Sequence, residues 1–191
     1  MTQPSLRPQD VVVLAKLVAY GGVRPPLARM AAELSISGSE VHGSLGRLVS
    51  ARLVSSVEGE VVHRPLLGAV EEFLVHGVKY AFPATRGEVT RGMPTSYAAP
   101  PLRARFGPTA ELPPVWPFSE GQARGVTLEP LYRTVPEASM RDAVLYELLA
   151  LVDAIREGRT RERRAAEEEL VARLRRQLDE RPQPPSARSR R

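Results

Sequence analysis

The segment from Ile36 to Val41 constrains the fold more tightly than any other part of the chain. Ser37 and Glu40 are spaced as a capping box, in which the serine hydroxyl accepts from the Glu40 amide and the glutamate reaches back to the Ser37 amide. Ile36 and Val41 occupy the two positions of a hydrophobic staple around the same cap. Both devices fix how the chain enters a helix predicted over residues 38–51.

Two helices are predicted before this cap. Apolar residues recur at helical spacing from Val11 to Val18, with Pro8 in the first turn and glycines ending the run. A short second helix follows the prolines at positions 25 and 26 and has one apolar face. Because the capping box comes directly after this helix, it specifies the angle between the second and third helices.

Two short strands and a fourth helix are predicted after the third helix. Segments 53–57 and 60–63 are rich in β-branched residues and flank Glu58-Gly59, which is a hairpin turn signal. Helical spacing of apolar residues predicts the fourth helix over 66–78. Residues 6–80 are therefore expected to form one domain.

The order helix, short helix, tight turn, capped helix and β-hairpin resembles the winged helix-turn-helix family, in particular bacterial regulators of the broad MarR-like kind. The matching segment runs from Leu27 to Val54. It has a Leu-Ala opening, an apolar residue in the turn, a polar capped start and a Leu-x-x-Ala-x-Leu-Val close. The resemblance covers about residues 6–64, a third of the chain.

The resemblance implies that the third helix enters the major groove of DNA, with its N-terminal residues at base edges and flanking groups on phosphates. The buried stripe of this helix leaves Arg47 facing outward, where it could hold a guanine with two hydrogen bonds, worth about 1–3 kcal/mol of discrimination. The DNA-contacting residues implied in this way are Ser37, Ser39, His42, Gly43, Arg47, Arg52, His63 and Arg64.

Gly43 and Gly46 each cost about 1 kcal/mol inside a helix relative to alanine. Close approach of the backbone to DNA and close packing against another helix explain them equally well. The wing tip, Glu58-Gly59-Glu60, is acidic where DNA-contacting wings usually carry arginine or lysine. The alternative function is therefore a protein-interaction adaptor built on a winged helix, for example an antitoxin-like partner of another protein.

Residues 81–136 are rich in proline and are expected to form an ordered extension that wraps over another domain or subunit. The dipeptides Arg86-Gly87, Arg91-Gly92 and Arg124-Gly125 are interpreted as turns within it. Trp116, the only tryptophan, is expected to anchor the extension on a helical domain, the alternative being an exposed contact with a partner.

Residues 137–180 are predicted to form a helical hairpin, with one helix from Pro136 to Gly158 and a second capped by Thr160. The second helix has a narrow apolar seam from Leu170 to Leu178 between charged residues. We favour a dimer interface over packing within the chain, because a two-fold protein matches a palindromic operator. The tail, residues 181–191, is basic; it is expected to be disordered and to add nonspecific phosphate affinity.

Composition narrows the function further. The net charge of +5 suits a polyanionic partner. Arginine supplies all but two of the 27 basic residues, which fits either phosphate recognition or a GC-rich genome. The chain has no cysteine, none of the common catalytic motifs and no metal-ligand spacing among its histidines. We therefore expect no cofactor, no metal and no catalytic residues. No segment has the length and hydrophobicity of a membrane span, and a cytoplasmic location is expected.

These features together predict a mainly α protein with an N-terminal winged helix-turn-helix (6–80), a proline-rich extension (81–136), a C-terminal helical hairpin (137–180) and a basic tail (181–191). The predicted function is that of a sequence-specific transcriptional regulator, a repressor or autoregulator that binds double-stranded DNA as a homodimer. Control by a protein partner is expected by analogy with toxin–antitoxin and defence operons.

Overall fold

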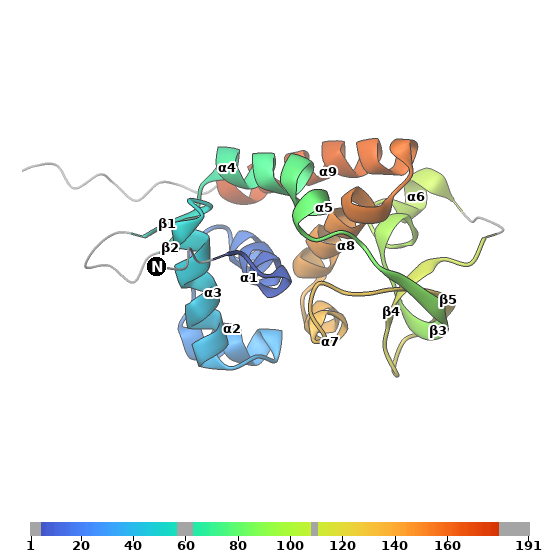
Figure 1. Cartoon of the computed structure of the whole chain (residues 1–191), viewed down its shortest axis with the longest axis horizontal. Coiled ribbons are helices and arrows are strands. Elements are labelled where there is room, and N and C mark those ends of the chain that lie inside the picture. The colour runs from blue at the N-terminus through green and yellow to red at the C-terminus, as the bar shows by residue number, and fades with distance from the viewer. Residues whose placement is uncertain (1–4, 57–62, 108–110, 180–191) are drawn as a thin grey trace, which may run out of the picture.

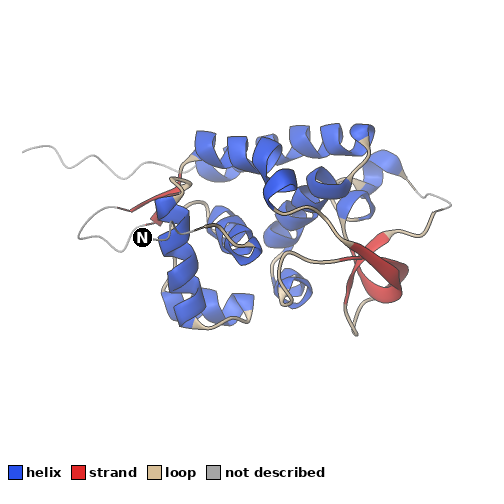
Figure 2. Cartoon of the chain, viewed as in Figure 1, coloured by secondary structure: helices blue, strands red, loops and turns tan. Residues whose placement is uncertain are grey.

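The computed structural model describes residues 5–56, 63–107 and 111–179, and it is mainly helical (Figures 1 and 2). The N-terminal part contains three helices, followed by two short antiparallel strands that pair Val54 with Pro65 and Ser56 with His63. The bounds of these elements are α1 Pro8–Ala19, α2 Leu27–Leu34, α3 Gly38–Ser50, β1 Val54–Ser56 and β2 His63–Pro65.

The capping box at the start of α3 is confirmed. The Ser37 hydroxyl accepts from the Glu40 amide at 3.2 Å, and the Glu40 carboxylate accepts from the Ser37 amide at 3.0 Å. The second strand begins at His63, where the predicted strand ends. The hairpin turn at Glu58-Gly59, with its acidic tip, lies outside the described residues.

The fourth helix continues beyond the predicted end at residue 78. It consists of α4 (Leu67–Glu72), a π-helical segment η1 (Phe73–Gly77) and α5 (Val78–Ala81). Figure 1 shows these segments in green, running toward the strands on the far side of the molecule.

Residues 86–107 and 111–128 contain a three-stranded sheet, which the proline-rich composition does not predict. The long strand β3 (Arg86–Pro94) pairs antiparallel with both β4 (Pro114–Pro117) and β5 (Ala123–Leu128), and β4 and β5 are parallel to each other. A short 3-10 helix, η2 (Ser96–Ala98), and α6 (Arg103–Phe106) lie between β3 and β4.

The interpretation of the arginine-glycine dipeptides as turns is wrong. All three lie in strands, Arg86-Gly87 and Arg91-Gly92 in β3 and Arg124-Gly125 in β5. A Cβ atom at Gly92 would lie 2.1 Å from the Trp116 carbonyl oxygen, and one at Gly125 would lie 2.0 Å from the Pro113 carbonyl oxygen. These glycines are therefore required by the close approach of neighbouring strands.

The C-terminal hairpin is confirmed, but its first helix is interrupted. Asp142 separates α7 (Val135–Arg141) from α8 (Ala143–Glu157) and caps α8, since its carboxylate accepts from the amides of Val144 and Leu145 at 3.0 Å. The last helix, α9, spans Thr160–Asp179.

The predicted cap of the last helix is wrong. Thr160 is already helical, and the cap is formed by Glu162, whose carboxylate accepts from the Arg159 amide at 3.0 Å. Glutamate at this position satisfies an unpaired amide at the helix start, as the serine–glutamate pair does in α3.

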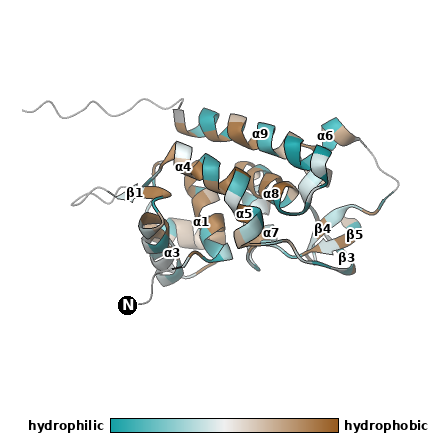
Figure 3. Ribbon diagram, turned by 45° about the horizontal axis from the view of Figure 1, so that its top comes forward, coloured by the Kyte–Doolittle hydropathy of each residue, from teal (hydrophilic) through white to brown (hydrophobic). Residues whose placement is uncertain are grey.

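A single hydrophobic core connects the parts of the chain. Helix α8 lies at its centre, with α1 on one side, α9 along another and the strands at its far end (Figure 1). Leu170 and Leu174 of α9 are fully buried in this core, so the seam expected to form a dimer interface packs within the same chain. Figure 3 shows brown running along α8, while α9 alternates with teal. Within the described residues, no helix is long and apolar enough to cross a membrane.

Candidate nucleic-acid interface

One face of α3 points away from the core. Ser39 and His42 are exposed on it, and Gly43 is half-buried. A Cβ atom at Gly46 would meet nothing within 4 Å, and one at Gly43 would lie 3.3 Å from Nη1 of Arg47, whose guanidinium is bound to Asp10. Packing within the described chain therefore does not explain Gly46, whereas Gly43 leaves room for the Arg47 guanidinium.

The start of this helix is negatively charged. The hydrogen bonds from Ser37 and from the Tyr132 hydroxyl, the latter at 3.0 Å, lower the pKa of Glu40 and keep its carboxylate ionised. The Ser37 hydroxyl is occupied by the cap and lies 3.0 Å from that of Ser39. Ser37 therefore serves the helix start, while Ser39 extends toward solvent.

Arg47 does not face outward as the helical pattern predicts. Its guanidinium holds the fully buried carboxylate of Asp10 in α1 with two hydrogen bonds, Nε to Oδ2 at 2.8 Å and Nη2 to Oδ1 at 2.7 Å. The same Nη2 donates to the Ser44 hydroxyl at 3.1 Å, and the Arg7 amide donates to Asp10 Oδ2 at 2.8 Å. Arg47 is therefore a structural link between α1 and α3, and its fork is occupied.

Arg24 and His42 lie near His63 of β2. Burial lowers the pKa of His63, and the nearby Arg24 and His42 lower it further. The Nδ1 atom of His63 is buried and lacks a hydrogen-bond partner among the residues that the structure describes. The structure thus places His42 near His63 and adds Arg24, which sequence reasoning missed.

The two remaining predicted contacts are exposed. Arg52 follows the end of α3 and adopts a left-handed backbone conformation, with φ of 58°. Arg64 projects from β2, and its carbonyl accepts from the Ser55 hydroxyl at 3.3 Å. Neither guanidinium has an ion pair within the described part of the chain, so both are available to an anionic partner.

Helix α7 fixes the turn between α2 and α3. The guanidinium of Arg141 donates to the Ala32 carbonyl oxygen at 3.3 Å and to the Ser35 hydroxyl at 3.1 Å. Ser35 itself closes α2 with a left-handed conformation, at φ 53°. The C-terminal hairpin therefore helps to set the orientation of α3.

A buried lysine ties the same elements together. Lys16 of α1 forms ion pairs with Glu33 of α2 at 2.7 Å and with the helix-capping Asp142 at 2.6 Å. Burial raises the pKa of Glu33, but hydrogen bonds from Arg29, Lys16 and Tyr20 outweigh this effect and lower the pKa to about 2. The anionic form of Glu33 is thus strongly stabilised, and α1, α2 and α8 are held in one arrangement.

The described residues contain no group of three or more histidine, cysteine, aspartate or glutamate side chains that could hold a metal ion. Comparison of the chain with protein-family models, curated proteins and solved structures gives no match. Function is therefore inferred from α3 and the residues around it.

Proposed function

We propose that the protein is a sequence-specific DNA-binding transcriptional regulator of the winged helix-turn-helix kind, with α3 as the recognition helix. The element order α1, α2, α3, β1, β2 supports the proposal, as does the capped and externally braced start of α3. A helix that reads base edges must be held rigidly, because specificity depends on the position of a few side chains.

The observation that carries the proposal is the glycine pair on the outer face of α3. Each glycine costs about 1 kcal/mol in a helix, and Gly46, unlike Gly43, has no neighbour within the described chain that requires it. A helix surface without side chains at two positions one turn apart allows the backbone to come close to DNA. Ser39 and His42, on the same face, supply hydrogen-bonding groups for base edges or phosphates.

Three arginines and one histidine, whose lowered pKa keeps it neutral at pH 7, are assigned to phosphate contacts. Arg52 follows the end of α3, His63 and Arg64 lie in β2, and Arg24 lies near His63. Arg47 is not assigned to a DNA contact, because its guanidinium is bound to both carboxylate oxygens of Asp10. The expected electrostatic footprint is therefore modest, which fits a net charge of only +5.

The proposed regulator is not catalytic and binds its operator as a homodimer, since a two-fold protein matches a palindromic site. The apolar seam of α9 is buried within the chain, so the dimer contact must lie on another surface. Repression or autoregulation would follow from steric control of a promoter.

The test compares binding of the protein to its own upstream region and to random DNA of equal length across a salt series. Gly46→Ala introduces a methyl group on the outer face of α3, where the structure leaves space for it. We expect this variant to be up to about 1 kcal/mol more stable toward unfolding and yet to bind the upstream DNA at least tenfold more weakly.

Gly68→Ala is the matched control, because Gly68 is a helical glycine in α4 with equally open surroundings. It should leave DNA binding unchanged. Equal, weak and steeply salt-dependent binding to both DNAs would reduce the interaction to nonspecific charge. Tight binding that Gly46→Ala does not weaken would show that α3 is not the recognition helix.

The second candidate is a protein-interaction adaptor, and it too has a specific observation behind it. Glu40 is held ionised at the start of α3, where it would repel a phosphate. Arg47, in the middle of the helix, is bound to Asp10 and does not extend toward a partner. Absence of binding to either DNA at low salt would favour this adaptor function, with α3 as the protein-binding surface.

A further inference from the structure

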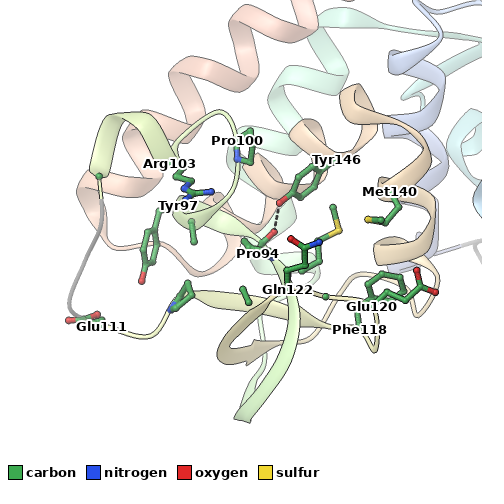
Figure 4. Close-up of a pocket in the computed structure, with 16 residues that line it drawn as sticks. Pro94, Tyr97, Pro100, Arg103, Glu111, Phe118, Glu120, Gln122, Met140 and Tyr146 are labelled. Atoms are coloured by element: carbon green, nitrogen blue, oxygen red, sulfur yellow. Dashed lines mark hydrogen bonds between the residues drawn. The ribbon is translucent and has the colours of Figure 1, made fainter.

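A large cavity lies between the three-stranded sheet and the C-terminal helices. It has a volume of about 710 Å³, and its walls come from the end of β3, from η2 and α6, from the loop before β5, and from α7 and α8 (Figure 4). Small-molecule sites in proteins typically measure about 300–1,000 Å³. The cavity is therefore of the size that holds a small organic ligand.

The two ends of the cavity differ in chemistry. Figure 4 shows Arg103 and Tyr97 at one end and Met140 with Phe118 at the other, with Tyr146 and Gln122 between them. Met140 is 60% exposed, so its side chain is accessible to a ligand in the cavity. The aromatic or apolar part of a ligand would cover Met140 and Phe118, while the polar groups of the ligand would contact the opposite end of the cavity.

Arg103 is a cation without an acidic partner among the described residues. The other arginine of α6, Arg105, pairs with Glu168 of α9 at 3.2 Å. The acid at this end of the cavity, Glu111, is paired with Arg159 at 3.0 Å, so its charge is already balanced. Arg103 thus offers an uncommitted guanidinium fork, the group best suited to bind a carboxylate, sulfonate or phosphate.

Tyr146 supplies a fixed polar group beside this cation. Its hydroxyl donates to the Pro94 carbonyl oxygen at 2.7 Å, which orients the ring and leaves the phenol oxygen as an acceptor. Burial raises the pKa of Tyr146 to about 12, against the opposing effect of the Arg103 charge. The phenol therefore stays neutral, and the positive charge of Arg103 is not cancelled within the cavity.

We propose that this cavity binds a small, largely aromatic or apolar molecule with one acidic group, with the acid on Arg103 and the apolar body against Met140 and Phe118. Glu120 lies near the apolar end and disfavours a second acidic group there. The ligand is thus a monoanion rather than a dicarboxylate. The proposal does not depend on whether α3 binds DNA.

The experiment titrates the full chain with two fluorescent probes of nearly equal shape. One is 1-anilinonaphthalene-8-sulfonate, which carries a single sulfonate, and the other is N-phenyl-1-naphthylamine, which has none. We expect saturable binding of the sulfonate at one site per chain and weaker binding of the neutral probe. Arg103→Ala should weaken the sulfonate about tenfold and leave the neutral probe unchanged.

Arg105→Ala is the matched control, because it removes an arginine from the same short helix on the side that faces Glu168. Met140→Glu should weaken both probes, since it places a charge where the apolar body lies. Near-ultraviolet circular dichroism of each variant confirms the native fold. The proposal is overturned if Arg103→Ala and Arg105→Ala bind the sulfonate alike, or if both probes bind equally well to the unchanged protein.

Discussion

The pair formed by Arg47 and Asp10 places two opposite charges between α1 and α3. Asp10 is fully buried, and its carboxylate also accepts from the Arg7 amide at the start of α1. Removing an ionised carboxylate from water is costly, so this group is tolerated only because the guanidinium fork satisfies both of its oxygens. The pair therefore fixes the position of α3 relative to α1.

Arg47→Ala is predicted to destabilise the fold rather than to remove a base contact. The variant leaves Asp10 buried without its cation, which costs about 3–5 kcal/mol of unfolding free energy. Urea unfolding followed by circular dichroism measures this loss. Arg52→Ala, at the exposed end of the same helix, should stay within about 0.5 kcal/mol of the original protein. Equal midpoints for the two variants would show that the pair is dispensable.

Residue roles could be predicted from the sequence where the partner is local. The bond between Ser37 and Glu40 spans three residues and has its own sequence pattern, so its prediction is confirmed. The partner of Arg47 lies 37 residues away, and helical periodicity shows only that the side chain is near the edge of the buried stripe. Arg24 was missed for the same reason, because its neighbour His63 comes from a distant strand.

At the scale of elements, the helices were predictable and the three-stranded sheet was not. Helices α1, α2 and α3 follow the period of their own apolar residues, with caps and breakers at their ends. Strand β3 begins with mostly exposed residues, and the sheet contains several prolines, so neither alternation nor composition reveals it. Its pairing depends instead on glycines that allow unusually close strands.

Gly125→Ala is predicted to disrupt this sheet. The added methyl group would lie 2.0 Å from the Pro113 carbonyl oxygen, a backbone atom that cannot move without shifting β4. We expect a loss of about 3 kcal/mol or more in unfolding free energy, within the range found for overpacking. Gly68→Ala, at an open position in α4, serves as the control and should not be destabilised. Unchanged stability of Gly125→Ala would mean that β4 and β5 are not in contact as described.

At the scale of the whole molecule, the sheet and the helices are joined through α8. The buried carboxylate of Asp153 accepts from the Trp116 indole at 2.6 Å and from the Thr95 hydroxyl at 2.8 Å, and it pairs with Arg156. Arg156 in turn donates to the Phe82 carbonyl oxygen at 2.8 Å. Trp116 is therefore an internal anchor, as expected, although its partner is a charged group in the core.

These links predict that the chain unfolds as one unit, despite its three stretches of different composition. Trp116 is the only tryptophan, so its fluorescence reports on the sheet, whereas circular dichroism at 222 nm reports on the helices. In a urea titration the two signals should give the same midpoint and the same slope. Asp153→Ala should lower both midpoints together, because it leaves Arg156 buried without its acid. The expected loss of unfolding free energy is about 3 kcal/mol.

A transition of the tryptophan fluorescence at a lower urea concentration than that of the circular dichroism would contradict this prediction. It would show that the sheet unfolds independently of the helices. The distinction bears on function, because the cavity lies against the sheet, α7 and α8, while α7 also holds the turn before α3. If the sheet and helices unfold together, a ligand that orders the cavity stabilises the arrangement of α3 as well. If they unfold separately, occupation of the cavity leaves the stability of α3 unchanged.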